Sequence, residues 1–434
     1  MLHMASVGID LDEVLSEPID WRSKSWPHSD RPVLIREAPA QHWNALSGDF
    51  SLPVLILKDS ALQHNIDLVA EYCRRNGVSL APHAKTPVAP QIVRRQLTAG
   101  AWAISVANFH QARLFRTLGL QRILLANELV ERDPLAWAAR EITADPSFEF
   151  YCLIDSVRGI ELMEAHLHAV GFTGKLAVLI ELGVAGGRCG CRTLDEATEV
   201  AARLANSTSL QLAGIEAYEG MVQIEELEPK LRAIDALCKD VRTFAERLDQ
   251  RHGLTPSRDL LVTVGGSLFV DRVVQELSRG WDLTVPVRVV VRCGAYVTHD
   301  IAENEKFSPF AGRSQGGDRL RQALELWAIV VSRPEPNFAV VGFGKRDAAH
   351  DRGWPKAFEI RRSGQTSPTS EAQITVLSLN DHHARVRLDG LENLEVGDQV
   401  GFHISHPCTT FDNWRLVPTV DDAYTVNEAT RCYL

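Results

Sequence analysis

A lysine and a histidine two residues apart form the first pair of side chains that could do chemistry together. The segment SLAPHAKTP places Lys85 directly after an apolar run, with His83 two positions earlier. Because side chains of a strand alternate between its two faces, His83 and Lys85 are expected on the same face. A lysine amine in a dry environment loses its charge more readily and can act as a nucleophile or a base. The alternative is an exposed lysine in a loop.

A second candidate lies near the C-terminus, in the segment GFHISHPCTTFDNW. His406 and Cys408 form an H-x-C element, and an imidazole with a thiolate favours a borderline-soft ion such as zinc. Two protein ligands leave coordination positions open, which is typical of a catalytic rather than a structural metal. A chance pair without a ligand is the alternative. We interpret His403, three residues before His406, as structural.

Further polar residues follow predicted strands, where barrel enzymes place catalytic groups. Arg188 follows the run LAVLIEL, and Tyr218 ends the run in GIEAYEGMV. The pair Gly265 and Gly266 follows LLVTV, and a glycine turn exposes backbone N–H groups that can surround a phosphate. A tight turn without a ligand is the alternative. Two cysteines of GGRCGCRT are interpreted as packing residues, because they lack neighbouring partners for a zinc site.

The elements that must position these residues alternate between short apolar runs and longer amphipathic segments, which is the pattern of repeated βα units. Eight runs are predicted as strands: Val54–Leu57, Leu80–Ala84, Ala103–Val106, Ile123–Ala126, Glu149–Ile154, Leu176–Leu182, Leu212–Tyr218 and Leu260–Val264. Eight parallel strands favour an α/β fold with a TIM-type (β/α)8 barrel. An open doubly wound sheet is the alternative.

After about residue 285 the pattern changes to short strands separated by turn residues, in LELWAIVVS, FAVVGFG, ITVLSLN, HARVRLD and VGDQVGFHI. This indicates a second, mostly β C-terminal domain. The expected division is residues 51–285 for the barrel and 286–434 for the β domain, with residues 1–50 joining the β domain. The polar stretch 361–371 is predicted to be a surface loop.

Composition excludes several classes of protein. The chain has 434 residues, 45% of them hydrophobic, and a formal net charge of −10, so its average surface repels nucleic acids and anionic membranes. No apolar run reaches the roughly 18–20 residues that span a bilayer, and the first residues lack the features of a signal peptide. The eight cysteines form no CxxC pair. We therefore expect a cytoplasmic protein with reduced thiols.

The run PHAKTPVAPQIVRRQLTAGAWAISVANFHQARLF followed by RILLANELV resembles the D-serine dehydratase and D-threonine aldolase family of pyridoxal-phosphate enzymes, which share the alanine-racemase type of fold (fold type III). The likeness extends with gaps from about residue 50 to residue 415. It implies that Lys85 carries pyridoxal 5'-phosphate. It also implies further cofactor-binding residues: Arg188 and Tyr218 near the cofactor ring, Gly265, Gly266 and Ser267 around the phosphate, and Tyr296 near the phosphate.

The element at His406 and Cys408 resembles the segment that supplies Zn2+ to D-serine dehydratases, although other divalent metals fit as well. D-threonine aldolases carry aspartate where this chain has Cys408 and use harder metals. The cysteine therefore favours a D-serine dehydratase that converts D-serine, or a related D-3-hydroxy amino acid, to a 2-oxo acid and ammonia. Aldolase-type cleavage to glycine and an aldehyde is the alternative.

The resemblance gives roles to the remaining residues. Lys85 would remove the α-proton of the substrate, and His83 would position the β-hydroxyl or relay a proton, with packing as its alternative. Asp347 and Asp351 are loose candidates for substrate contact, because the segment VVGFGKRDAAHDRGWP departs from the family pattern. By analogy with related enzymes we expect a homodimer that binds a small D-amino acid.

Overall fold

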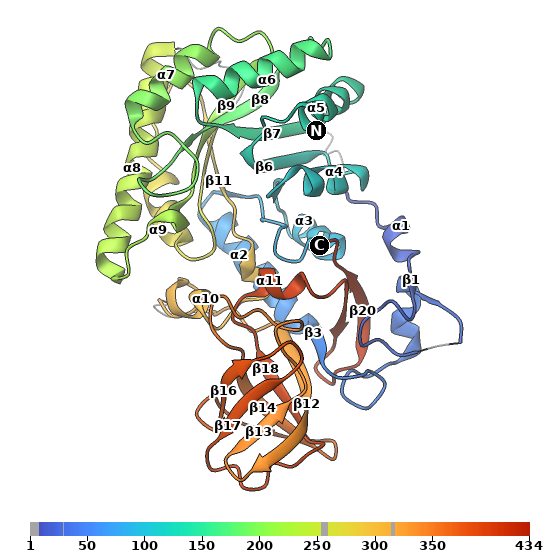
Figure 1. Cartoon of the computed structure of the whole chain (residues 1–434). Coiled ribbons are helices and arrows are strands. Elements are labelled where there is room, and N and C mark those ends of the chain that lie inside the picture. The colour runs from blue at the N-terminus through green and yellow to red at the C-terminus, as the bar shows by residue number, and fades with distance from the viewer. Residues whose placement is uncertain (1–7, 29, 253–258, 314–316) are drawn as a thin grey trace. The chain divides into compact units, whose positions relative to one another are not determined.

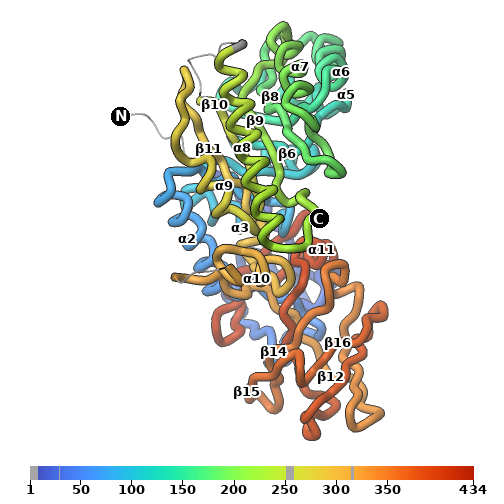
Figure 2. Tube along the Cα trace, turned by 90° about the vertical axis from the view of Figure 1, so that its left-hand side faces the viewer, coloured from blue at the N-terminus to red at the C-terminus, as the bar shows by residue number. Residues whose placement is uncertain are grey.

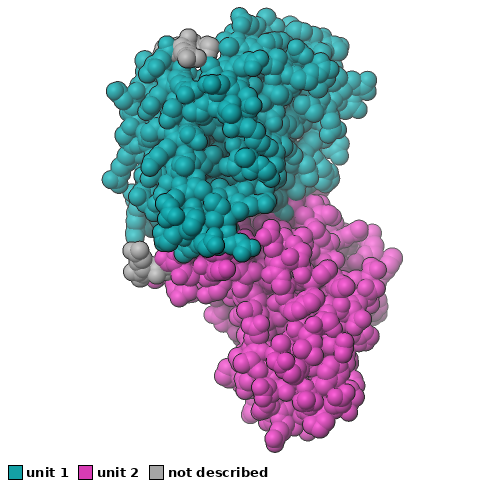
Figure 3. All heavy atoms as spheres, turned by 60° about the vertical axis from the view of Figure 1, so that its left-hand side comes forward, with its two compact units in different colours: residues 1–9, 70–85, 96–294 teal, residues 10–69, 86–95, 295–434 magenta. Residues whose placement is uncertain are grey.

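The computed structural model describes residues 8–28, 30–252, 259–313 and 317–434. The chain forms two compact units, which Figure 3 shows in different colours. Unit 1 comprises residues 1–9, 70–85 and 96–294, and unit 2 comprises residues 10–69, 86–95 and 295–434. Each unit is described by itself.

Unit 1 is built on a sheet of eight parallel strands. In chain order they are β4 (Ser79–Leu80), β5 (Ile104–Val106), β6 (Arg122–Glu128), β7 (Glu149–Ile154), β8 (Leu176–Leu182), β9 (Leu210–Ala217), β10 (Leu260–Val264) and β11 (Val287–Val291). Backbone hydrogen bonds join the two edges of the sheet, from Trp102 N–H to the Leu80 carbonyl (2.7 Å) and from Ser105 N–H to the Pro82 carbonyl (3.0 Å). The sheet thus closes on itself, and the predicted barrel is confirmed.

Helices cover the barrel strands on the outside (Figures 1 and 2). They are α4 (Phe109–Thr117), α5 (Arg132–Ala144), α6 (Val157–Ala169), α7 (Leu194–Leu204), α8 (Leu227–His252) and α9 (Val270–Leu277), while α2 (Asp59–Arg75) and α3 (Pro90–Thr98) each belong partly to both units. All seven residues of β8 are buried, as expected for a parallel strand between two packed faces. In the described part of the chain, no helix has the length and apolar character needed to cross a membrane.

One predicted barrel strand is wrong. The run 54–57 forms β3 (Val54–Lys58), which pairs antiparallel with β12 and parallel with β19 in unit 2. The missing barrel strand is β11, which pairs with β10 and β4 and which the sequence pattern had placed beyond the barrel. Both runs are short and apolar, and such runs do not reveal which sheet a strand joins.

Unit 2 contains a ten-stranded sheet in which almost all neighbours are antiparallel. Besides β3, its strands are β12 (Leu324–Glu335), β13 (Phe338–Val341), β14 (Lys356–Arg362), β15 (Gln365–Pro368), β16 (Ile374–Leu379), β17 (Ala384–Leu388), β18 (Gln399–His403), β19 (Leu416–Val420) and β20 (Val426–Arg431). The five β segments predicted after residue 320 correspond to β12, β13, β16, β17 and β18. The predicted second domain, mostly β, is confirmed.

The loop predicted at 361–371 contains β15, which pairs with the end of β14. All four residues of β15 are exposed, so this edge strand lacks the apolar alternation by which strands are recognised. The short elements α1 (Asp12–Leu15), β1 (Pro18–Ile19), β2 (Val33–Leu34) and η1 (Ile35–Gln41) belong to unit 2. So do η3 (Ala295–Val297), α10 (Glu303–Phe307) and α11 (Pro407–Phe411).

Unit 2 has its own apolar core around Trp327, which contacts Phe358 and Tyr424 edge to face with ring centroids 5.6 Å apart in each pair. Residues from the N-terminal segment, among them Ile19 and Phe50, belong to the same core. Burial of these side chains holds the N-terminal elements within unit 2, because their apolar surface is removed from water there.

Candidate active site

Lys85 lies in a turn five residues after the end of β4. The strand is shorter than predicted, so strand alternation does not account for the pairing of Lys85 with His83. The turn brings them together instead, with the Lys85 backbone N–H directed at His83 Nδ1 over 3.4 Å. His83 N–H donates to the Cys293 carbonyl (3.2 Å), and this bond fixes the segment against the end of β11.

The environment of His83 keeps its imidazole neutral. Burial lowers the pKa of His83 well below its usual value, and the positive charges of Lys85, Arg292 and Arg188 lower it further. Gly294 makes room for it, because a Cβ on Gly294 would lie 2.9 Å from the His83 Cβ and 2.6 Å from its carbonyl oxygen. A neutral imidazole can accept a hydrogen bond, whereas its lowered pKa disfavours the uptake of a proton.

Arg188 lies on a tightly held loop between β8 and α7. The Arg192 guanidinium donates to the carbonyls of Arg188 (2.5 Å), Cys189 (2.6 Å) and Gly190 (2.7 Å). The chain turns back so closely that a Cβ on Gly190, which has φ +95°, would lie 2.4 Å from the backbone nitrogen of Gly183. The loop therefore has one fixed shape.

This loop brings two of the predicted residues together. The Arg188 guanidinium carbon lies 4.9 Å from the centroid of the Tyr218 ring, a cation–π contact. Tyr218 in turn lies beside the glycine turn after β10, since a Cβ on Gly266 would be 3.3 Å from Tyr218 Cε2. The structure therefore places Arg188, Tyr218 and Gly266 in one neighbourhood of unit 1.

The glycine turn itself has a partner that sequence reasoning missed. Gly266 N–H donates to Glu219 Oε1 (2.8 Å), and Gly294 N–H donates to Ser267 Oγ (3.3 Å). Gly265 has φ +111°, a conformation that favours glycine. Glu219 is buried, and burial raises the pKa of its carboxyl although the Gly266 N–H opposes the shift. One of the amides predicted to bind phosphate is therefore already engaged by Glu219.

The barrel also encloses a buried ion pair that the sequence did not reveal. Arg292 and Glu216 are 4% and 2% exposed and form a salt bridge. Arg292 also donates to Thr263 Oγ1 (2.7 Å). Glu216 lies between the buried residues Ile215 and Ala217, and Arg292 directly follows the buried run Val289–Val291. A charged residue next to such apolar residues was the available signal. Buried charges that are paired in this way hold the neighbouring strands in a defined arrangement.

Two carboxyl groups and a thiol at the Arg188 loop form a second cluster that the sequence did not reveal. The ligand atoms of Glu128, Glu181 and Cys189 all lie within 4.8 Å of one another, a spacing that could hold a metal ion. Burial, the charge of Glu216 and a hydrogen bond with Glu128 raise the pKa of Glu181 to about 10. Burial, together with Glu128, raises the pKa of Cys189 to about 12. Glu181 and Cys189 thus keep their protons at neutral pH, so this cluster would have to lose protons before it bound a cation.

In unit 2, His406 and Cys408 lie where β18 leads into α11. His406 precedes this short helix, and its Nδ1 lies 2.6 Å from Asp351 Oδ2. Thr409 Oγ1 lies 3.1 Å from both Asp351 Oδ1 and His406 Nδ1. Cys408 Sγ lies 3.3 Å from the hydroxyl of Thr86, the residue after Lys85 in the chain. We call Thr86, Asp351, His406, Cys408 and Thr409 the histidine–cysteine cluster.

The two predicted metal ligands are in contact within this cluster. A hydrogen bond with Cys408 is the main cause that raises the pKa of His406, and Asp351 adds to it. Burial opposes ionisation of Asp351, but the hydrogen bond and charge of His406 outweigh it and lower the pKa of Asp351. The donor atoms, an imidazole nitrogen and a thiol sulfur, suit zinc.

Other predicted residues of unit 2 have structural contacts. Asp347 is buried and accepts from Lys24 Nζ (2.7 Å) and Gly344 N–H (2.8 Å), which accounts for both of its carboxylate oxygens. His403 stacks on Phe358 with ring centroids 4.1 Å apart. Tyr296 lies in η3 and is 1% exposed. Its place near a phosphate stays a prediction.

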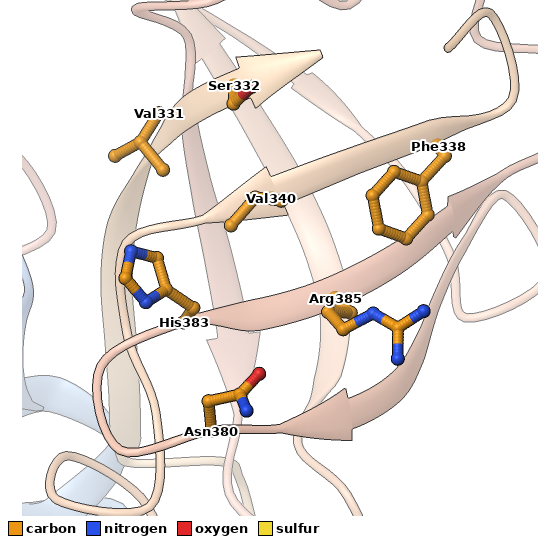
Figure 4. A pocket seen from close by; sticks show the side chains of 7 residues that line it. All are labelled: Val331, Ser332, Phe338, Val340, Asn380, His383 and Arg385. Carbon is orange, nitrogen blue, oxygen red and sulfur yellow. The ribbon is translucent and has the colours of Figure 1, made fainter. Parts of the chain in front are cut away.

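A hollow of ≈ 600 Å³ on unit 2 is formed by side chains of the β sheet, among them Val331, Phe338, Val340, His383 and Arg385 (Figure 4). It contains none of the residues that the sequence singled out. The hollow is open, and its side chains supply no pair of metal ligands such as His406 and Cys408.

Family models match both parts of the chain. The alanine racemase N-terminal domain matches residues 57–258, and the putative serine dehydratase domain matches residues 323–420. The first match covers most of the barrel, and the second covers strands β12 to β19 of unit 2 and the histidine–cysteine cluster from Asp351 to Thr409. The resemblance inferred from the sequence is confirmed.

Individual relatives match most of this chain at low sequence identity. D-threonine aldolase from Arthrobacter sp. is 24% identical over 378 residues, which cover 86% of this chain and 90% of the relative. 3-Hydroxy-D-aspartate aldolase from Paracoccus denitrificans is 25% identical over 309 residues, 71% of this chain and 75% of the relative.

Among solved structures, D-threo-3-hydroxyaspartate dehydratase from Delftia sp. HT23 aligns with a TM-score of 0.67 at 20% identity, over 88% of this chain and 98% of that chain. Variants of D-threo-3-hydroxyaspartate dehydratase with one histidine or one cysteine replaced by alanine also align, and the cysteine variant is in the metal-free form. The chain therefore combines a region that matches the alanine racemase N-terminal domain with a later region that matches the putative serine dehydratase domain.

Proposed function

We propose that this enzyme is a D-amino acid dehydratase that depends on pyridoxal phosphate and zinc and converts D-serine, or a related D-3-hydroxy amino acid, to a 2-oxo acid and ammonia. The observation that carries the proposal is the histidine–cysteine cluster, where His406 and Cys408 contact each other and Asp351 engages His406 Nδ1. The relatives support the substrate class, because their names describe enzymes that act on D-3-hydroxy amino acids.

The residues of unit 1 fit pyridoxal phosphate. Lys85 offers the amine, Arg188 lies over the Tyr218 ring, and the glycine turn beside Tyr218 would hold the phosphate, with the Gly266 N–H released from Glu219. When bound, the cofactor would stabilise negative charge at the substrate α-carbon. Lys85 Nζ would remove the α-proton. The neutral imidazole of His83 would accept a hydrogen bond next to Lys85.

The residues of unit 2 fit a soft divalent metal, with His406 and Cys408 as its ligands. When bound, zinc would offset the negative charge on a departing hydroxide. In D-threo-3-hydroxyaspartate dehydratase the replaced histidine and cysteine are two positions apart, as His406 and Cys408 are in this chain. The metal-free form of the cysteine variant supports a metal role for Cys408.

Aldolase-type cleavage of D-3-hydroxy amino acids to glycine and an aldehyde is the second candidate. It is favoured by the two curated relatives, which are aldolases. The thiol of Cys408 argues for dehydration, because the family resemblance implies an aspartate at this position, and harder metals, for D-threonine aldolases. Both reactions begin with the same substrates and differ in whether the bond to hydroxyl or the Cα–Cβ bond breaks.

Product analysis tests the proposal. The purified chain, loaded with pyridoxal phosphate, is incubated with D-serine, D-threonine and D-3-hydroxyaspartate and with the L-forms, with and without zinc after chelation. We expect 2-oxo acid and ammonia from the D-forms only, with zinc restoring the chelated enzyme. Glycine with an aldehyde would establish the aldolase, and turnover unaffected by chelation would overturn the metal role.

Lys85→Ala tests the lysine, with Lys239→Ala on the exposed face of α8 as the matched control. We expect Lys85→Ala to lose both turnover and the absorbance band above roughly 400 nm that a lysine-bound cofactor gives. The control should keep both. A Lys85→Ala enzyme that retained the band would show that another lysine carries the cofactor.

The predicted homodimer is tested separately, by measuring the mass of the particle in solution by sedimentation.

A further inference from the structure

We propose that Asp351 is a positioning residue that orients His406 for the metal through its hydrogen bond to Nδ1. The inference rests on the proposed function, because it takes His406 and Cys408 as the metal ligands. In this inference the carboxylate of Asp351 does not bind the metal itself but determines which ring nitrogen of His406 faces the metal.

The contacts of His406 separate its two ring nitrogens. Nδ1 lies 2.6 Å from Asp351 Oδ2 and 3.1 Å from Thr409 Oγ1. With a carboxylate as its partner, Nδ1 carries the proton and donates it, which leaves Nε2 with the lone pair that a metal needs. Metal-bound histidines in proteins are commonly held in this way, by an acceptor on the nitrogen away from the metal.

Asp351 acts as an outer partner and not as a third ligand. One of its carboxylate oxygens is engaged by His406, and the other accepts from the Thr409 hydroxyl at 3.1 Å. Thr409 Oγ1 donates to Asp351 and also lies 3.1 Å from His406 Nδ1, so the three side chains are in mutual contact. A carboxylate held from two sides keeps the imidazole in one orientation.

The backbone around Asp351 is also fixed. Asp351 forms an isolated bridge with Gly353, and Ser405 Oγ donates to the Gly353 carbonyl at 2.7 Å. Ser405 directly precedes His406, so this bond ties the Asp351 turn to the segment that carries the ligand. Gly353 has φ +106°, which a residue with a side chain rarely adopts. The carboxylate is therefore placed by the fold and does not depend on a flexible loop.

Metal affinity is the direct readout, measured on the full chain by competition for zinc with a chromophoric chelator. We expect Asp351→Ala to weaken zinc binding by about 10–100-fold. Asp351→Asn should weaken it less, because the amide oxygen still accepts from Nδ1 but carries no charge. Asp412→Asn, at an exposed aspartate that directly follows α11, is the matched control and should bind zinc like the unchanged chain.

Cobalt supplies a second readout that does not depend on turnover. In the cobalt-loaded chain, the sulfur-to-metal charge-transfer band reports the Cys408 bond, and the visible bands report the ligand geometry. We expect Asp351→Ala to keep the Cys408 band and to change the visible bands. Zinc affinity and cobalt spectra of Asp351→Ala that match those of the unchanged chain would overturn the inference.

Cys408→Ala and His406→Ala separate this inference from the proposed function. If these variants bind zinc as tightly as the unchanged chain, the ligand assignment itself fails. If they lose zinc while Asp351→Ala retains full affinity, only the role of Asp351 fails. The thermal unfolding midpoint of each metal-free variant shows whether a loss of affinity reflects misfolding.

Discussion

The barrel interior of unit 1 and the histidine–cysteine cluster of unit 2 differ in how far their charged and polar side chains are exposed to solvent. In the barrel, Glu216 and Arg292 are 2% and 4% exposed and neutralise each other. In the cluster, the side chains of His406 and Asp351 are 26% and 48% exposed. Buried charges must be paired permanently, whereas half-exposed donors can exchange one partner for another. The barrel is therefore suited to hold a fixed geometry, and the cluster to bind an exchangeable ligand.

A buried carboxyl in unit 2 refines this contrast. Glu325 is 6% exposed and is buried like Glu216, but its oxygen Oε2 accepts from the neutral indole of Trp327 (2.8 Å) and not from a guanidinium. Burial, which outweighs the Trp327 hydrogen bond, raises the pKa of Glu325 to about 7. Depth alone thus does not determine the charge of a buried acid, since the charge of its partner matters too.

Breaking the barrel ion pair should have the largest effect. Arg292→Leu leaves Glu216 buried without a countercharge, and we expect the free energy of unfolding of unit 1 to fall by about 3–5 kcal/mol. Urea unfolding followed by circular dichroism measures the loss.

Two variants control this prediction. Arg132→Leu removes an arginine that is 71% exposed and paired with Asp133, so it should change the free energy of unfolding by no more than about 1 kcal/mol. In the double variant Glu216→Leu with Arg292→Leu, both charges are gone and much of the stability should return. A double variant as unstable as Arg292→Leu would show that packing, not the unpaired charge, causes the loss.

The fold could be read from the sequence where burial leaves a pattern. Apart from Glu181, the run LAVLIEL is apolar because β8 is covered on both faces, and its predicted bounds agree with the observed ones. The sheet to which each strand belongs could not be predicted in the same way. Val54–Lys58 and Val287–Val291 are equally short and apolar, but they belong to different sheets, because partners far away in the sequence decide which sheet a strand joins.

The candidate site was predictable to the extent that residue type alone signals chemistry. Lys85, His406 and Cys408 stand out by type and spacing. Arg188 and Tyr218 are in contact, and their place at the cofactor ring stays a prediction. Residues that act through a neighbour carry no such signal. Glu219 reaches the glycine turn from 47 positions away, and Asp351 reaches His406 from 55 positions away. Their roles follow only from the fold.

Glu325→Gln should remove a pH dependence of stability. The folded pKa of about 7 lies above the ordinary 4.5, so the folded state holds the proton more tightly. The stability that this proton contributes is complete below pH 4.5 and is lost as the pH rises through 7. Between roughly pH 5 and 8 we expect the unchanged chain to lose about 2–3 kcal/mol relative to Glu325→Gln.

The measurement compares urea unfolding of the two proteins at each pH, so that titrations elsewhere in the chain cancel. The glutamine keeps an oxygen that can accept from the Trp327 indole, and the packing stays nearly the same. A difference in free energy that does not vary with pH would mean that Glu325 does not titrate in this range.

Replacing the thiol ligand Cys408 should change which divalent metal ion binds most tightly. In Cys408→Asp a carboxylate replaces the thiol, and we expect zinc to bind at least about tenfold more weakly, or 1.4 kcal/mol, while manganese gains relative to zinc. With D-threonine as substrate, part of the product should become glycine and an aldehyde. Chelator competition and product analysis test the two effects separately. Unchanged selectivity for zinc over manganese would contradict a ligand role for Cys408.

Thr86→Val should have the smallest effect. The hydroxyl lies 3.3 Å from Cys408 Sγ and would donate to the thiolate once the metal has displaced its proton. Valine keeps the shape of threonine and loses this bond, so zinc affinity should fall by about fivefold, or 1 kcal/mol. Because Thr86 follows Lys85, the cofactor absorbance is the internal control and should stay unchanged. Altered absorbance with unaltered zinc affinity would assign Thr86 to the lysine and not to the histidine–cysteine cluster.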